Sequence, residues 1–345
     1  MKIGKMLKIH VIDATHGDCL LLDFDHSKIL IDCGPKSFKA RRDVLANIKK
    51  ILGENSVIDI AIVTHNDDDH IGGFEFLLDT SIKIKTIIFN SLQDIPDIIK
   101  SSQKQISYNQ DNILRQKLLE EQGIQIQCLT RNSTPLIFKD IKLTAITPTA
   151  EILERMLKDA DAKKEREEKK KRQKQISSSK IEEIKSAEAL QKIQSGQDTF
   201  IKDTSITNKS SIGLVIEYGN FSGLFLGDAH AEDVIEGLNI AGFVKHQFDV
   251  VKISHHGSEH NTSIDLLELI GKTEYILCAD NETKNKHPNN ITLARILSFD
   301  NNPTIHLSSN SSHLSVKIEE CKSLGFDINE NYPSNGVNTL SYEYK

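Results

Sequence analysis

A buried strand that runs directly into a cluster of charged side chains is the feature that most restricts how this chain can fold. Residues 57–63 form a nearly continuous apolar run, which is typical of a strand covered on both faces. The next residues, 65–70, read HNDDDH, and a short segment at 72–78 that begins with two glycines is expected to be helical. The charged cluster therefore lies where a buried strand gives way to a helix.

The rest of the chain alternates between strands and helices. Three β-rich segments at its start, residues 7–13, 18–24 and 28–32, are expected to be consecutive antiparallel strands, and residues 40–52 have the apolar spacing of an amphipathic helix. Further along we expect a strand at 82–89, a helix at 111–122, paired strands at 124–128 and 137–146, strands at 211–218, 223–226 and 248–253, and a helix from 232. This alternation predicts the α/β (α+β) class.

The composition changes sharply at residues 151–197, where residues 163–174 are almost entirely charged and aromatic residues are absent. We expect no core there, but either a solvated helix held by Glu–Lys pairs or a disordered insertion. Because the same alternation resumes afterwards, we interpret the chain as one interrupted domain. Residues 1–150 and 201–345 are then its two halves, and residues 151–200 are the charged insertion.

Composition excludes some classes of protein. The chain has 345 residues, with 49 acidic and 43 basic side chains and a net charge of -6, which argues against a surface that binds nucleic acid everywhere but allows a local basic groove. Its five cysteines include no CxxC pair, so they indicate neither a disulfide framework nor a cysteine zinc site. Since no apolar run reaches the roughly 18 residues of a membrane span, we expect a cytoplasmic protein that does not bind membranes.

The HNDDDH cluster predicts a metal site. The segment packs two imidazoles and three carboxylates into six residues. The three carboxylates repel one another unless a cation neutralises them, and a divalent ion is the usual cation where His and Asp converge. The competing interpretation is a solvated acidic loop with incidental histidines. Its position at a strand end and the glycine pair that follows favour the metal site.

Several segments resemble one known family. Residues 65–73 look like the HxHxDH motif of metallo-β-lactamase-fold hydrolases, in the HxDxDHxGG form typical of the hydrolase domain of the competence protein ComEC and its relatives. Four further segments resemble the family and occur in the family's order. An opening hairpin at 10–19 and 29–34 precedes the motif, and a strand ending at Gly227-Asp228, an HHGS segment at 255–258 and a histidine-proline loop at 285–288 follow it. The resemblance implies a four-layer αββα sandwich with a site at one edge, between the two sheets.

The resemblance also implies which side chains bind metal. His65 and Asp67 would bind a first ion, Asp69 and His70 a second, and Asp228 both. One of two adjacent histidines would complete the second site, and the sequence leaves open which one. The expected ligands are therefore His65, Asp67, Asp69, His70, Asp228 and either His255 or His256.

Two departures from the family's broader pattern affect the choice of metal. The chain has Asp67 where that pattern has a histidine, and it lacks a further histidine in residues 207–211; the ComEC-like branch shares both differences. More oxygen donors shift the preference from zinc toward manganese or magnesium, although zinc remains compatible. We expect one or two divalent ions.

The expected reaction is hydrolysis. A divalent ion lowers the pKa of bound water, supplies hydroxide near neutral pH and polarises the bond to be cut. Asp69 would orient the water, whereas His256 or His287 would contact a substrate phosphate or protonate the leaving group. The expected catalytic residues are Asp69, Asp228, His256 and His287.

Three functions fit this reading. ComEC-like hydrolases are associated with cutting phosphodiesters, especially DNA, so the resemblance implies a nuclease or phosphodiesterase; the acidic balance opposes this, and the positive charge of residues 163–174 supports it. An alternative enzyme would hydrolyse a small phosphodiester, a phosphorylcholine ester or a lactone. A third alternative is a metal-binding sensor or assembly subunit that binds a partner protein through residues 151–197.

Overall fold

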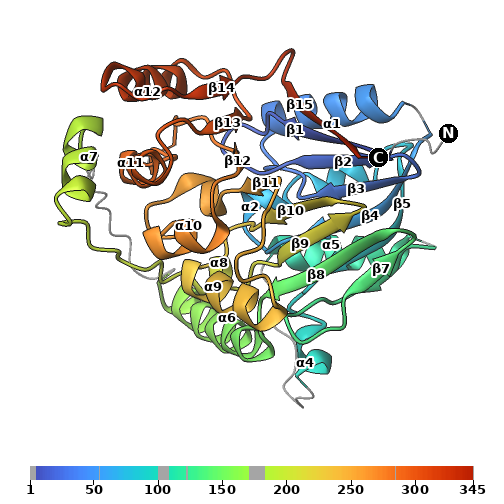
Figure 1. The fold of residues 1–345 in the computed structure, drawn as a ribbon. Coiled ribbons are helices and arrows are strands. Elements are labelled where there is room, and N and C mark those ends of the chain that lie inside the picture. Colours follow the sequence, from blue (N-terminus) through green and yellow to red (C-terminus); the bar gives the residue numbers. More distant parts are fainter. Residues whose placement is uncertain are drawn as a thin grey trace.

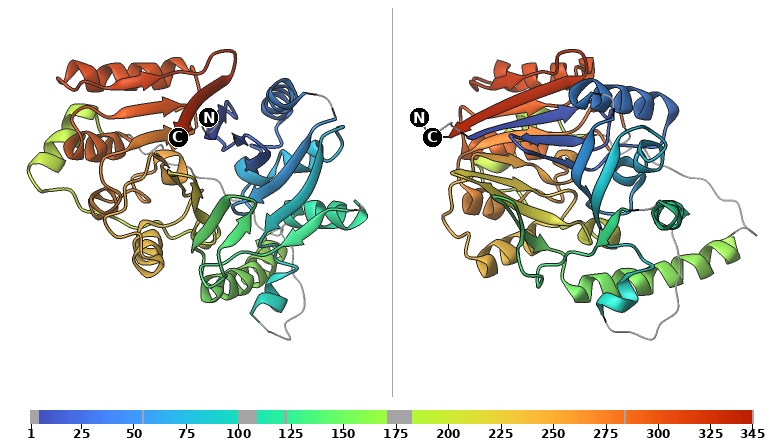
Figure 2. Two further views of the ribbon diagram at one scale, coloured as in Figure 1. Left: turned by 45° about the vertical axis from the view of Figure 1, so that its right-hand side comes forward. Right: turned by 90° about the vertical axis from the view of Figure 1, so that its right-hand side faces the viewer.

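Two β-sheets face each other and carry helices on their outer faces (Figures 1 and 2). The computed structural model describes residues 5–53, 55–99, 109–121, 123–170, 183–283 and 285–344. Apolar side chains from both sheets, such as Leu22, Ile62, Leu214 and Val250, form the layer between them. The four-layer αββα sandwich predicted from the sequence is confirmed.

The first sheet has seven strands among the described residues. In spatial order they are β15 (Val337–Tyr344), β1 (Lys5–Ile12), β2 (Leu20–Phe24), β3 (Ser27–Ile31), β4 (Val57–Val63), β5 (Lys83–Phe89) and β6 (Gln125–Gln127). The pairs from β15 to β3 are antiparallel, as predicted for the opening strands, and those from β3 to β6 are parallel. The strand predicted at residues 57–63 coincides with β4 and is almost fully buried.

The second sheet has eight described strands. In spatial order they are β14 (Asn329–Asn331), β13 (Thr304–Leu307), β12 (Glu274–Leu277), β11 (Val250–Lys252), β10 (Phe221–Phe225), β9 (Gly213–Tyr218), β8 (Ile141–Thr147) and β7 (Leu136–Phe138). The predicted pairing of residues 124–128 with 137–146 is wrong, because β6 lies in the first sheet. Residues 137–146 instead contain most of a hairpin, β7 and β8, which turns at Lys139 with φ of +55°.

Helices cover the outer face of each sheet. The first sheet carries α1 (Phe38–Leu52), α2 (Asp68–Ile71), α3 (Phe74–Leu77) and α5 (Asn109–Glu120). The second carries α9 (Ala231–Ala241), α10 (Ile264–Ile270), α11 (Asn290–Phe299) and α12 (Ser312–Ser323). Two short helices, α4 (Ile95–Ile98) and α8 (Ile206–Lys209), lie near the start of the insertion and before β9. None of the helices in the described ranges is both long enough and apolar enough to cross a membrane.

The helix predicted at residues 72–78 begins earlier, at Asp68, and is broken into α2 and α3. Carboxylates at Asp68 and Asp69 occupy the first turn of α2, where the exposed backbone N–H groups favour negative charge. Gly73 then separates the two helices. A Cβ atom on Gly73 would lie 2.0 Å from the carbonyl oxygen of Cys33, so only glycine lets this turn approach the chain after β3.

The described residues of the charged insertion form two helices, α6 (Ala150–Lys170) and α7 (Ser186–Gln194). The expectation that no core forms there is wrong for part of it. The first turns of α6 bury Leu153, Met156 and Leu157 against the segment around α4, and α7 packs Ala189 against α11. Apolar residues at helical spacing therefore dock both helices, despite the charge around them. Residues 163–170 are helical in their backbone, whereas residues 171–182 lie outside the described ranges.

Candidate metal centre

Three loops at strand ends meet at one edge of the sandwich. The first follows β4 and leads into α2, the second follows β10 and carries Asp228, and the third is a short 3-10 turn after β11, Ser254–Gly257, that carries two histidines. The β4 loop belongs to one sheet and the other two loops to its partner. The side chains that the sequence singled out at residues 65–70, at Asp228 and at residues 255–256 therefore come together.

Asp228 lies at the centre of this group, and its side chain is 3% exposed. Its Oδ2 lies 3.7 Å from the Nε2 atoms of both His65 and His255. Its Oδ1 lies 3.3 Å from Nε2 of His70, and Oδ2 also lies 3.7 Å from Nε2 of His256. One buried carboxylate thus faces four imidazoles.

Backbone and carboxylate acceptors orient two of these imidazoles. Nδ1 of His70 donates to Oδ2 of Asp32 at 2.8 Å, and Nδ1 of His256 donates to the carbonyl oxygen of Cys278 at 2.8 Å. With its proton held on Nδ1, a neutral imidazole leaves the lone pair of Nε2 free to bind a cation. The two Nε2 atoms lie 3.3 Å apart and so face the same point.

The other two imidazoles are held in a similar way. Nδ1 of His255 lies 2.9 Å from Oδ1 of Asn261, and Nδ1 of His65 lies 3.2 Å from the hydroxyl of Thr64. Their Nε2 atoms both point to Asp228. An imidazole with one nitrogen anchored and the other facing a shared carboxylate is the usual arrangement of a histidine that ligates metal.

Several buried atoms in and around the centre lack hydrogen-bond partners among the described residues. Nε2 of His65 and Oδ1 of Asp228 are two of them. A buried polar atom without a partner costs free energy unless something else binds it. Because both atoms are electron-pair donors that face one small space, a divalent cation would satisfy them, and the residues present fit such an ion.

The donors divide into two sets that share Asp228. His65, Asp67 and His255 lie on one side, where Nε2 of His65 is 3.6 Å from Oδ2 of Asp67. Asp69, His70 and His256 lie on the other, where Oδ2 of Asp69 is 3.3 Å from Nε2 of His256. The geometry thus groups His256 with the second set, which the sequence left open. Each set contains two imidazoles, so both sets offer the same number of nitrogen donors.

A buried ion pair next to the centre was missed by the sequence analysis. Lys252, on β11, pairs with Asp18, and its ammonium group also donates to the carbonyl oxygen of Gly227 at 2.9 Å. Burial opposes ionisation of Asp18, but Lys252 and the nearby histidines lower its pKa to about 2. A lysine in the apolar run of β11 was the available signal, since a buried lysine needs a partner.

The carboxylates give this centre a strongly negative electrostatic potential. Burial alone would lower the pKa of His256, yet Asp228 and Asp18 raise it to about 10. Asp228 and Asp32 likewise outweigh burial and raise the pKa of His70 well above its usual value. In the absence of a metal ion, protons on these imidazoles would supply the positive charge that the carboxylates demand.

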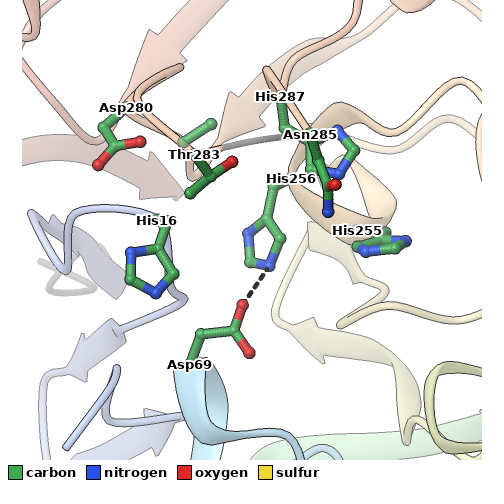
Figure 3. Close-up of a pocket in the computed structure, with 9 residues that line it drawn as sticks. His16, Asp69, His255, His256, Asp280, Thr283, Asn285 and His287 are labelled. Carbon is green, nitrogen blue, oxygen red and sulfur yellow. Dashed lines mark ion pairs between the residues drawn. The ribbon is translucent and has the colours of Figure 1, made fainter. Parts of the chain in front are cut away.

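A cavity of about 110 Å³ opens over this centre (Figure 3). Asp69 and His256 face each other at its floor, and His287 lines its wall. His16, at the turn between β1 and β2, lines the opposite side and was not predicted. The remaining lining residues are His255, Ala279, Asp280, Thr283 and Asn285.

Parts of the chain are similar to known proteins. A family model described as a metallo-beta-lactamase superfamily domain matches residues 21–92. ComE operon protein 3 of Bacillus subtilis (strain 168) is 24% identical over 319 residues, which cover 86% of this chain and 32% of that protein. The chain thus spans about a third of the length of this relative.

Two solved structures resemble this chain at low sequence identity. The metallo-beta-lactamase fold protein YhfI from Bacillus subtilis has a TM-score of 0.46 and 12% identity, over 98% of this chain and 99% of its own. Zn(2+)-bound PqqB from Methylobacterium extorquens has a TM-score of 0.43 and 11% identity, over 94% of this chain and 87% of its own.

Proposed function

Because the chain is a metallo-β-lactamase superfamily protein and a distant homologue of ComE operon protein 3, we propose that it is a metal-dependent hydrolase that cleaves phosphodiesters, with DNA as its substrate. The observation that carries the proposal is the buried carboxylate of Asp228 facing the Nε2 atoms of four imidazoles. Each Nδ1 atom of these imidazoles already has a hydrogen-bond partner. Such a site is built to hold cations rather than to stabilise the fold alone.

We assign the ligands from the two donor sets. His65, Asp67 and His255 would hold one ion, and Asp69, His70 and His256 the other, with Asp228 shared between them. Two imidazoles and two carboxylates in each set suit manganese or zinc, and magnesium also fits the oxygen donors. When bound, the metal supplies Lewis acidity, which makes water nucleophilic near neutral pH and polarises the scissile bond.

The protein's own side chains would do the rest of the chemistry. Asp69 lies at the cavity floor, where its free carboxylate oxygen can accept a proton from the attacking water and orient it. His287 and His16 line the cavity on opposite sides, so they can donate hydrogen bonds to phosphate oxygens or to the leaving group. The hydrogen bonds that anchor the four imidazoles would let them bind cations with little rearrangement of the protein.

The test is hydrolysis by two matched variants. With manganese added, the wild-type protein should degrade single- or double-stranded DNA, and Asp69→Asn should lower kcat by about 100-fold or more, because it removes a water-orienting carboxylate. Asp68→Asn is the control, since Asp68 accepts a hydrogen bond from Gln110 instead and should retain wild-type turnover. Equal DNA cleavage by the two variants would refute the role of Asp69.

The shape and charge of the cavity support a second candidate, a small phosphodiester. The cavity of about 110 Å³ is small, so it suits a phosphate group, and the rest of a substrate would lie outside it. A neighbouring groove is lined by four acidic residues, Asp13, Asp43, Asp280 and Glu282, and by one lysine, Lys39, so its excess of negative charge would repel a polyanionic strand on that side. Both features favour a substrate that presents a single phosphate.

A substrate panel separates the candidates. Cleavage of bis-p-nitrophenyl phosphate with DNA left intact would favour the small substrate, whereas cleavage of both would favour the nuclease. Stoichiometric metal by elemental analysis, together with no turnover of any ester, would instead point to a metal-binding sensor or assembly subunit. A partner protein lost on deletion of residues 151–197 would then be the supporting result.

A further inference from the structure

The far end of the charged insertion lies against the loop that carries His287. Glu183, just before α7, accepts a hydrogen bond from the backbone N–H of Asn290 at 2.8 Å, at the first residue of α11. The side chain of Asn290 donates back to the carbonyl oxygen of Ile184 at 2.8 Å. Hydrogen bonds therefore join the insertion to the segment directly after the histidine-proline loop.

A buried lysine connects Glu183 to the two sides of His287. Lys317, on α12, is 5% exposed, and its ammonium group donates to the carbonyl oxygens of Lys286 at 3.1 Å and Pro288 at 2.7 Å. The same ammonium lies 2.8 and 3.0 Å from the two carboxylate oxygens of Glu183. The carbonyls on both sides of His287 and the carboxylate from the insertion thus share one buried cation.

The histidine-proline loop in turn rests on the turn that carries the metal-centre histidines. The N–H of Asn289 donates to the carbonyl oxygen of Gly257 at 3.0 Å. A Cβ atom on Gly257 would lie 2.6 Å from Cβ of Pro288, so the loop and the turn are in close contact. A shift of the loop therefore changes where His287 stands relative to His256 across the cavity.

We propose that Glu183 is a positioning residue of the site: through Lys317 it holds the loop of His287 against the cavity, and the insertion thereby sets the geometry of catalysis. The catalytic half of this inference rests on the proposed function. Nothing but Glu183 among the described residues gives the buried ammonium of Lys317 an opposite charge within ion-pair distance. Without that carboxylate the ammonium would be buried and uncompensated, and its hold on the two carbonyls would weaken.

The attachment of α7 does not depend on this ion pair. Ala189 of α7 is fully buried against Ile291 and Ala294 of α11, and Ser186 donates to Glu320 of α12 at 2.9 Å. Replacing Glu183 should therefore leave α7 docked. The replacement should change only the position of the loop around His287, which Lys317 holds.

The first measurement is turnover by a matched pair of variants. Glu183→Gln should lower kcat/KM by roughly 10- to 100-fold with metal content unchanged, the cost of misplacing a group at the reacting bond by about an ångström. Glu183→Asp, which keeps the charge, should restore part of the loss. Glu188→Gln is the control, because Glu188 lies on the same insertion and, among the residues that the structure describes, forms an ion pair with Lys192 alone on the surface of α7. Turnover by Glu183→Gln equal to that of Glu188→Gln would overturn the proposal.

The second measurement needs no substrate. Amide hydrogen exchange in the peptide that spans residues 285–292 should be about tenfold faster in Glu183→Gln than in Glu188→Gln, because the loop opens more often. The double variant E183Q/K317M, which removes both charges, should show the same increase and serves if the single variant does not fold. Unchanged exchange in these variants would refute the positioning role. If the wild-type protein hydrolyses no phosphodiester, the proposed function fails while this comparison still decides the role of Glu183.

Discussion

Asp32 orients His70 from beneath the metal centre. Its side chain is fully buried, and Oδ2 accepts hydrogen bonds from Nδ1 of His70 at 2.8 Å and from the hydroxyl of Thr64 at 2.7 Å. Oδ1 accepts from the N–H of Thr64 at 2.8 Å. A carboxylate behind a ligating histidine fixes its tautomer and raises its basicity.

We expect Asp32→Asn to weaken metal binding by about 10- to 100-fold, because an amide is a poorer partner for Nδ1 of His70. The measurement is a competition titration against a chelator of known affinity. Asp59→Asn is the matched control, since Asp59 is a buried carboxylate of β4 that accepts from the N–H of Lys28 and from Lys85, away from the centre. Equal affinity in both variants would contradict the role of Asp32.

Asp111 is a buried carboxylate with an altered titration. It accepts hydrogen bonds from Ser91, Asn66 and the N–H of Leu92, yet burial outweighs them and raises its pKa to about 6. The folded protein therefore binds this proton more tightly than the unfolded chain does. The stabilisation is present in full below the unfolded pKa near 3.8 and is lost as the pH rises through about 6.

From this shift we expect the free energy of unfolding of the wild-type protein to fall by about 2 kcal/mol between pH 4 and pH 7, relative to Asp111→Asn. Urea unfolding of the two proteins across that range measures the difference, and other titrating groups cancel between them. A constant difference across the range would show that Asp111 titrates normally.

At the scale of elements, a single glycine sets how closely α9 approaches β8. Gly237 lies in the interior of α9, and a Cβ atom there would lie 2.1 Å from the carbonyl oxygen of Ile146 in β8. Alanine normally stabilises a helix interior relative to glycine by about 1 kcal/mol. Here the backbone contact reverses that expectation.

Gly237→Ala should therefore destabilise the protein by about 1–3 kcal/mol, since the helix must move away from the sheet to admit the methyl group. Asn239→Ala, at an exposed position of the same helix, is the control and should leave the stability unchanged or slightly raised. Both are measured by urea unfolding. A stabilising effect of Gly237→Ala would mean that α9 and β8 tolerate a wider spacing.

At the scale of the whole molecule, the metal centre joins the two halves of the sandwich. His65, Asp67, Asp69 and His70 follow a strand of the first sheet, whereas Asp228 and the paired histidines follow strands of the second. An ion bound between them would cross-link the sheets at the edge where the cavity opens. Its binding free energy would then add to the stability of the entire domain.

Removal of metal should accordingly lower the thermal stability of the wild-type protein. With metal at 1,000 times its dissociation constant, binding adds about 4 kcal/mol to the free energy of unfolding, so chelation should lower the Tm by roughly 5 °C or more. Asp228→Asn should lose this dependence, because the shared ligand is gone. Identical melting curves with metal and with chelator would indicate that no ion bridges the sheets.

The sequence by itself determined many of the elements and the kinds of side chain that gather at the site. The apolar run of β4 and the spacing of α1 are local patterns, so they predicted buried faces without knowledge of their neighbours. The HNDDDH segment carries its chemistry in contiguous residues, and the resemblance to metallo-β-lactamase-fold hydrolases indicated that Asp228 and the HHGS segment would join it.

Only the tertiary structure decided which atoms meet. The acceptor for His70 lies 38 residues away at Asp32, and that for His256 lies 22 residues away at Cys278, so no local pattern could pair them. The placement of His256 with Asp69, and of Glu183 against Lys317, depends on how the helices and sheets pack. Periodicity reports which face of an element is buried, whereas hydrogen-bond partners depend on the packing of segments that are distant in the sequence.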